Sequence, residues 1–111
     1  MMNINVINRK PTHPGEILKY HYLEPLGLSI TELARLLNVS RKAISSIVNE
    51  RKAVTAEMAL RLARAFDTTP ELWLNLQKNY DLWRAAQNTS DWQKIEPIYK
   101  PEEDLEPTPV A

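Results

Sequence analysis

The stretch ITELARLLNVSRKAISSIVN, residues 30–49, constrains the fold more than any other part of the chain, because its helix start and stop signals fall in register. Ser29 and Glu32 have the spacing of a capping box, which starts a first short helix. Asn38 tolerates the left-handed conformation in which helices often end, and Ser40 is a strong N-cap for a second helix. The spacing therefore predicts two short helices joined by a tight turn.

Each predicted helix has an apolar face. In the first, the apolar residues recur at helical spacing as Leu33, Ala34, Leu36 and Leu37, and in the second they are Ile44, Ile47 and Val48. The opposite side of the second helix is a polar stripe rich in hydrogen-bond donors and free of carboxylates, made of Arg41, Lys42, Ser45, Ser46 and Asn49. This combination is typical of a DNA-binding helix-turn-helix, and an ordinary helical hairpin with a solvated outer face is the alternative.

Length and composition indicate a small all-α protein. The chain has 111 residues, enough for one domain, and 43% of them are hydrophobic. Glycine occurs only twice and the alternation of Val, Ile and Thr typical of strands is missing, so the predicted fold class is all-α. No apolar run approaches the roughly 20 residues of a membrane span, and we expect no membrane partner. The sequence contains no cysteine and its N-terminus lacks a signal-peptide core, and both features fit a cytoplasmic protein.

Patterns of catalytic and metal-binding residues are missing from the sequence. It has no paired-carboxylate, Ser/His or Cys/His arrangement and no glycine-rich phosphate loop, so we expect neither an enzyme nor a cofactor. His13 and His21 are the only histidines, and no cysteine or carboxylate cluster accompanies them at ligand spacing. We therefore predict a helix cap and a surface residue at these positions and no metal site.

The net charge of zero hides an uneven distribution. Residues 1–90 contain 12 Lys and Arg against 8 Asp and Glu, whereas residues 91–111 contain 2 against 6. A mildly basic body is compatible with DNA binding through a local patch. The chain is thus expected to divide into a flexible N-terminal arm at 1–11, a folded DNA-binding and dimerisation domain at 12–88, and an acidic, proline-containing tail at 89–111.

Three more helices complete the predicted domain. The first opens at residues 12–14 and ends in a turn over 24–28. The fourth covers 56–66 after the N-cap Thr55, and the fifth runs from Pro70 to about residue 87. A short capped segment over 89–95 would follow.

The fifth helix carries more large apolar residues than one packing face can hold. Leu72, Leu76 and Trp83 are candidates for the core. A second subunit is an economical use for the remaining apolar surface, because helix-turn-helix proteins commonly read two half-sites as symmetric dimers. The candidate dimer interface comprises Trp73, Leu74, Tyr80 and Trp83, with Trp83 counted in both sets. The alternative is that these side chains close a small monomeric core.

The candidate DNA-binding residues fall into two groups. The polar stripe is assigned to base edges and nearby phosphates, with Arg41 or Lys42 suited to guanine and Asn49 to adenine. Helix caps and a basic loop are assigned to backbone phosphates, and these residues are Ser29, Ser40, Arg51, Lys52 and Thr55. For Thr55 a cap without DNA contact is the alternative. The predicted partner is double-stranded operator DNA with inverted half-sites about 10 bp apart.

These residues also resemble a known family. Residues 30–49 are similar to the helix-turn-helix of lambda-repressor and Cro-like (XRE-type) regulators, and the flanking segments resemble HigA-type antitoxins. The similar segments are HPGEIL at 13–18, EPLGLS at 24–29 and VTAEMALRLARAFDTTPELWLNLQKNYDLW at 54–83. The resemblance implies a five-helix lambda-repressor-like fold, a homodimer, repression of the protein's own operon and neutralisation of a HigB-type toxin that cleaves messenger RNA.

Two other functions stay open from the sequence. One is a stand-alone helix-turn-helix repressor, and the other is a protein-interaction module without DNA binding. The carboxylate-free stripe is evidence against the interaction module. The tail at 96–111 lies outside the family pattern, and its acids and aromatic residue suggest contact with the basic surface of an RNA-cutting toxin.

Overall fold

The computed structural model describes residues 9–99, and within them every regular element is helical. The elements in chain order are α2 (Pro14–Ile17), the π-helix η1 (Leu18–Leu23), α3 (Glu24–Leu26), α4 (Ile30–Leu37), α5 (Arg41–Val48), α6 (Ala56–Phe66), α7 (Pro70–Asn88) and the 3₁₀ turn η2 (Asp91–Lys94). Because α2, η1 and α3 follow one another without a break, this part of the chain holds five helical rods and a short turn. The all-α, five-helix prediction is confirmed, while most of the predicted arm and the tail from residue 100 lie outside the described residues.

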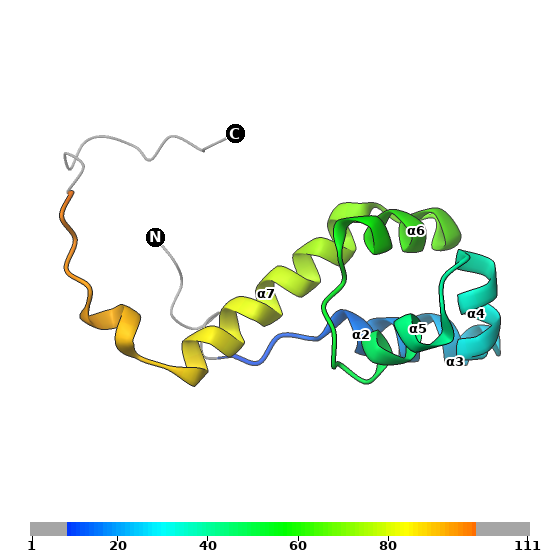
Figure 1. The fold of residues 1–111 in the computed structure, drawn as a ribbon, viewed down its shortest axis with the longest axis horizontal. Coiled ribbons are helices and arrows are strands. Elements are labelled where there is room, and N and C mark those ends of the chain that lie inside the picture. Colours follow the sequence, from blue (N-terminus) through cyan, green and yellow to red (C-terminus); the bar gives the residue numbers. More distant parts are fainter. Residues whose placement is uncertain (1–8, 100–111) are drawn as a thin grey trace.

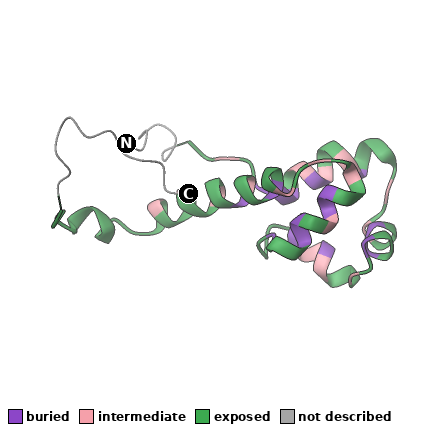
Figure 2. Cartoon of the chain, turned by 90° about the horizontal axis from the view of Figure 1, so that it is seen from above, coloured by how far each residue is buried: buried purple, intermediate pink, exposed green. Residues whose placement is uncertain are grey.

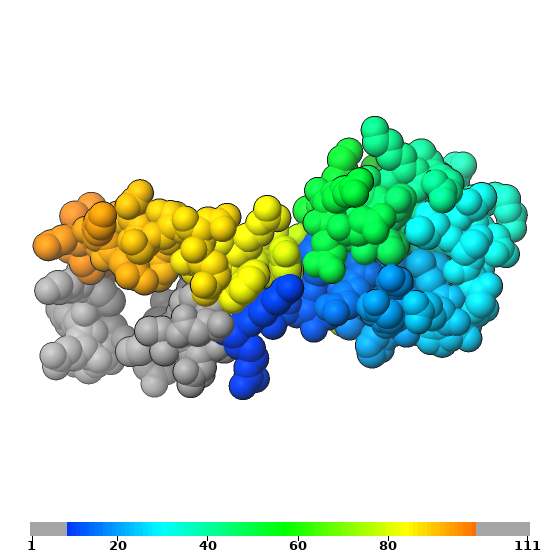
Figure 3. Space-filling model, turned by 90° about the horizontal axis from the view of Figure 1, so that it is seen from below, coloured from blue at the N-terminus to red at the C-terminus, as the bar shows by residue number. Residues whose placement is uncertain are grey.

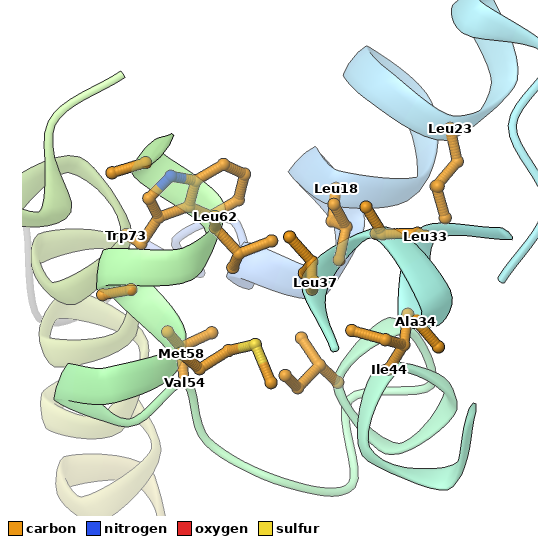
Figure 4. Close-up of a cluster of buried hydrophobic side chains, with 13 residues drawn as sticks. Leu18, Leu23, Leu33, Ala34, Leu37, Ile44, Val54, Met58, Leu62 and Trp73 are labelled. Atoms are coloured by element: carbon orange, nitrogen blue, oxygen red, sulfur yellow. The ribbon is translucent and has the colours of Figure 1, made fainter. Parts of the chain in front are cut away.

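One core joins these rods at one end of the molecule, and α7 extends away from it (Figure 1). Leu18, Ile44 and Leu62, from three different rods, are each 0% exposed. Figure 4 shows their side chains converging between α4, α5 and α6. Buried residues concentrate in this bundle, whereas the far half of α7 is mainly exposed (Figure 2). The core therefore fixes the motif helices, and α7 presents a free surface.

The helix ends of the motif are those that the sequence predicts. The Ser29 hydroxyl accepts the Glu32 N–H at 3.0 Å, and the Glu32 carboxylate accepts the Ser29 N–H at 3.2 Å, which completes the capping box. Asn38 ends α4 in the left-handed region at φ 57° and ψ 48°. Ser40 caps α5 by accepting the Ala43 N–H at 3.1 Å. Each of these helix ends depends on residues next to it in the chain. The local sequence was therefore enough to predict it.

The first rod runs further than predicted, because it continues through Leu26 where a turn over 24–28 was expected. Pro25 lies inside it, and a proline lacks an N–H and crowds the carbonyl four residues earlier. The π-helix η1 accommodates this: the Glu24 N–H bonds to the Lys19 oxygen, five residues back. Gly27 then ends the rod at φ 62°, and the Leu28 N–H bonds to the Leu23 oxygen at 2.9 Å.

The interface role predicted for Trp73 is wrong, because this side chain belongs to the core. Trp73 is 0% exposed within its own chain, and its ring lies 5.7 Å from that of Tyr22 and 6.5 Å from that of Phe66. Its Nε1–H donates to the Thr68 hydroxyl at 2.9 Å, so the polar atom of the indole is satisfied internally. A second subunit cannot reach a side chain that is enclosed in this way.

Two leucines expected in the core lie on the surface instead. Leu36 on α4 is 58% exposed, and Leu72 on α7 is 38% exposed. In α4 the core takes only Leu33, Ala34 and Leu37, because an eight-residue helix that packs on one side turns its remaining positions outward. In α7 Trp73 takes the place in the core that the sequence analysis gave to Leu72.

Candidate nucleic-acid interface

The polar stripe of α5 faces outward while the opposite side of the helix anchors it. Ile44 and Ile47 are 0% and 3% exposed in the core. Arg41, Lys42 and Asn49 are exposed, and Ser45 and Ser46 are half-buried beside them. The helix contains no acidic residue. Its surface therefore offers positive charge and hydrogen-bond donors to an anionic partner, on a rigid element.

The side chains at the two ends of the stripe are held in place. At the start of α5, Arg41 Nε donates to the Thr31 hydroxyl of α4 at 3.1 Å. At its end, the Asn49 amide donates to the backbone oxygen of Ser45 at 2.9 Å and to its hydroxyl at 3.2 Å. An asparagine needs that amide group to read adenine. Asn49 must release Ser45 before it can make such a contact, whereas Arg41 keeps its terminal guanidinium nitrogens for a base or a phosphate.

The basic loop folds back onto the end of α5. The backbone N–H groups of Arg51 and Lys52 both bond to the Ser46 oxygen, at 2.8 Å and 3.2 Å. Glu50 allows this turn with a left-handed backbone at φ 60°. Both basic side chains are exposed. The structure thus brings Arg51 and Lys52 beside the stripe, as the phosphate-binding assignment requires.

The three capping residues differ as phosphate ligands. The Glu32 carboxylate already accepts the backbone N–H of Ser29. This hydrogen bond is the main cause of the lowered pKa of Glu32, and the hydrogen bond with the Ser29 side chain is the second cause. A persistent negative charge there opposes a phosphate. Ser40 begins α5, whose first turn holds no acid, so it is the better candidate. Thr55 caps α6 by accepting the Met58 N–H, but Glu57 lies in the same first turn.

Several residues that position the interface were missed by the sequence analysis. Gly15 of α2 lies against the backbone of Ile47, so closely that a Cβ on it would overlap the Ile47 carbonyl oxygen. Arg61 of α6 donates to the Leu37 oxygen at 2.6 Å, which satisfies a free carbonyl at the end of α4. These contacts join residues that are distant in the chain, so no local pattern predicts them. For Gly15 the one signal in the sequence was that glycine is scarce.

A buried glutamine anchors the loop that follows α5. Gln77 of α7 is 6% exposed, and its side-chain oxygen accepts the Val54 N–H at 2.9 Å. Its amide nitrogen donates to Asp81 at 2.9 Å. The sequence analysis did not single out Gln77, because a lone amide in an apolar helix has no pattern of its own. The bond ties the chain between α5 and α6 to α7.

His13 joins the first rod to α7, and its predicted role as a cap is confirmed. Its Nδ1 accepts the Gly15 N–H at 2.9 Å, and its ring meets that of Tyr80 edge-on, with centroids 4.7 Å apart. Burial lowers the pKa of His13, a change that Glu50, Asp81 and Glu16 oppose and that Arg84 reinforces. His21 is exposed, as predicted.

The other candidate interface residues of α7 lie on two different sides. Leu74 is 36% exposed and shares a shallow surface hollow with Val54, Lys78 and Leu82. Tyr80 and Trp83 are half-buried on the side of His13, with ring centroids 5.9 Å apart. The Trp83 indole N–H is buried and has no hydrogen-bond partner among the residues that the structure describes. Leu82, 49% exposed, belongs to the Leu74 surface and was not predicted.

Other kinds of site find no support in the part of the chain that the structure describes. Among residues 9–99, no group of three His, Cys, Asp or Glu side chains is placed to hold a metal ion. No helix in that range is long and apolar enough to cross a membrane.

Comparison with known proteins gives consistent matches. A helix-turn-helix family model matches residues 20–73. The uncharacterized HTH-type transcriptional regulator YbaQ of Escherichia coli is 56% identical over 87 residues, which are 78% of this chain and 77% of that protein. Antitoxin HigA-1 of Vibrio cholerae is 37% identical over 82% of this chain and 87% of its own length. The solved structure of Pseudomonas aeruginosa antitoxin HigA with the higBA promoter matches with a TM-score of 0.76 at 40% identity, over 81% of this chain and 100% of that one.

Proposed function

This chain belongs to the helix-turn-helix family of transcription regulators and antitoxins, and we propose that it is a HigA-type antitoxin that represses its own operon. One observation carries the proposal: the whole length of an antitoxin HigA solved with its promoter matches this chain at 40% identity. The donor-rich surface of α5 supplies the chemistry that such a role needs.

On DNA, α5 lies in the major groove with its N-terminal end toward the base edges. Arg41, oriented by Thr31, is the leading candidate for guanine, with Lys42 beside it. Ser45, Ser46 and Asn49 continue the contact along the groove. Ser40, Arg51 and Lys52 hold phosphates on either side, and Ser29 and Thr55 contribute less because carboxylates lie in the same first turns.

A homodimer provides the second reading helix for an inverted repeat. The exposed side of α7 that bears Leu74 and Leu82 suits a twofold axis, because Lys78 and Asp81 on it are complementary to a second copy of themselves. Tyr80 and Trp83 lie on the other side of α7 and stay candidates for a second contact between the subunits. The buried Trp83 N–H, which finds no hydrogen-bond partner in residues 9–99, is a reason to expect rearrangement there on assembly.

The second activity is neutralisation of a HigB-type toxin that cleaves messenger RNA. The role is stoichiometric binding rather than catalysis, in keeping with a family of regulators and antitoxins. Because the two activities act on operator DNA and on a toxin that cleaves messenger RNA, we expect both in the cytoplasm.

Fluorescence anisotropy tests the repressor activity. The protein is titrated onto DNA from upstream of its own gene and onto scrambled DNA, each at two salt concentrations. We expect selective binding with a dimeric stoichiometry, and a salt dependence that reflects released counterions. Equal, weak binding to both DNAs would overturn the proposal. Co-expression with the toxin encoded in the same operon tests neutralisation, since growth should be restored.

A stand-alone repressor is the second candidate, because a relative of 56% identity carries only the description of a transcriptional regulator. Selective operator binding together with failure to restore growth in the toxin test would favour it.

A further inference from the structure

Beyond α7 the chain displays a row of large apolar side chains on its surface. Their exposed fractions are 44% for Trp92, 74% for Ile95, 102% for Ile98 and 75% for Tyr99. Side chains of this size are rarely gathered in an exposed segment unless it binds something. The helix-turn-helix match ends at residue 73, so this segment is not part of the DNA-binding motif.

The segment begins in a defined conformation. The Thr89 hydroxyl accepts the Asp91 N–H at 3.1 Å, and the Trp92 indole N–H donates to the Thr89 oxygen at 3.0 Å. These bonds hold the 3₁₀ turn η2, from which the chain continues without regular structure to residue 99. Trp92 is therefore presented at a fixed place past the end of α7.

The spacing of the apolar residues matches a conformation with three residues per turn. Trp92, Ile95 and Ile98 are three apart, so they align on one side of either a 3₁₀ or a polyproline II helix. Pro97 disfavours an α-helix and favours the extended form. A segment of this kind binds by placing successive apolar side chains into a groove.

The charge of the segment indicates the partner. The described residues 91–99 contain Asp91 and Glu96 against Lys94, and the sequence that follows is also rich in acids. A protein that cuts RNA must attract phosphates, so its active surface is basic. Figures 1 and 3 place η2 at the far end of α7 from helices α4 to α6, so the segment points away from the body of its own chain.

We propose that Trp92, Ile95 and Ile98 form a docking motif for the cognate toxin, an inference that rests on the proposed antitoxin function. The three side chains enter an apolar groove on the toxin, and Asp91 and Glu96 face its basic RNA-binding surface. Inhibition then follows from competition, because the antitoxin's carboxylates occupy the positions that RNA phosphates need.

The test compares Ile95→Ser/Ile98→Ser with the wild-type chain by calorimetric titration of the purified toxin. Leu60→Ser is the matched control, because Leu60 on α6 is 59% exposed and outside the segment. We expect the double variant to bind the toxin about 10- to 100-fold more weakly. Its melting temperature and its affinity for operator DNA should stay at the wild-type values, and Leu60→Ser should leave all three unchanged.

Three outcomes would overturn the inference, and they differ from one another. Unchanged toxin affinity in the double variant, with the wild-type chain binding well, removes the docking motif and leaves the antitoxin function intact. A wild-type chain that does not bind the toxin removes the antitoxin function as well. Conversion of the dimer to a monomer by the double substitution, measured by sedimentation, would show that the segment covers a second copy of this chain instead.

Discussion

Gly15→Ala tests how the first rod holds the recognition helix. The added Cβ would overlap the Ile47 carbonyl oxygen and lie 2.9 Å from its carbonyl carbon, where ordinary contact begins at 3.4 Å. Both neighbours are backbone atoms, so no side chain can rotate away. Either α2 or the end of α5 must move. Because Ile44 and Ile47 are packed in the core, a shift of α5 is transmitted to the stripe that we assign to DNA.

The expected loss of stability follows from overpacking. Inserting a methyl group into a filled contact costs about 1–3 kcal/mol, which exceeds the gain of about 0.4–1 kcal/mol from a stiffer unfolded chain. For a domain of this size each kcal/mol lowers the melting temperature by about 4–8 °C. A shifted α5 would also lose base contacts worth about 1–3 kcal/mol each, so operator affinity should fall about tenfold or more. Thermal unfolding and fluorescence anisotropy on the operator measure the two effects.

Gly27→Ala provides the matched control. Gly27 adopts φ 62°, but a Cβ there would meet nothing within 4 Å. This substitution should cost about 1 kcal/mol through backbone strain alone and leave operator affinity unchanged. The positioning role of Gly15 would be refuted if Gly15→Ala kept both its melting temperature and its affinity, or if Gly27→Ala lost as much affinity as Gly15→Ala.

Three other predictions test separate parts of the structure. Gln77→Leu should lower the free energy of unfolding by about 1–3 kcal/mol in urea titrations, because the buried Val54 N–H loses its acceptor. Stability should fall as the pH drops below about 6.5, since burial lowers the pKa of His13 and the unfolded chain takes up the proton first; His13→Asn should reduce this dependence in urea titrations at pH 7.5 and 5.5. Arg41→Ala should cost about 1–3 kcal/mol of operator binding and relax base preference, whereas Lys52→Ala should weaken all sequences equally and flatten the salt dependence in anisotropy.

Helix ends could be predicted because each is settled within a few residues. Ser29 and Glu32 bond to each other, Asn38 adopts the left-handed conformation by itself, and Ser40 caps its own helix. The outward-facing stripe followed from helical spacing alone. These features depend on local hydrogen bonding and sterics, which the sequence states directly.

The side of α7 that meets the core could not be predicted in the same way. Apolar residues occur all around this helix, so periodicity does not select between Leu72 and Trp73. The choice depends on where Tyr22 and Phe66 lie, and these belong to other rods. The bond between Gln77 and Val54 likewise joins residues 23 apart in the chain. Such contacts are products of the assembled fold and have no local signal.

The two proposed binding surfaces lie in different parts of the molecule, α5 in the bundle and the docking motif beyond the end of α7, and this has a consequence for regulation. A toxin docked on the segment after α7 would leave α5 uncovered, because η2 lies beyond the C-terminal end of α7, apart from the bundle that holds α5 (Figure 1). The docked toxin can then affect repression only through the dimer, by changing the distance between the two α5 helices. Toxin should therefore leave affinity for DNA with a single half-site unchanged, while it alters affinity for the full inverted repeat if that spacing changes. Anisotropy on both DNAs, with and without toxin, measures this; a toxin that abolishes half-site binding would place its contact on α5 instead.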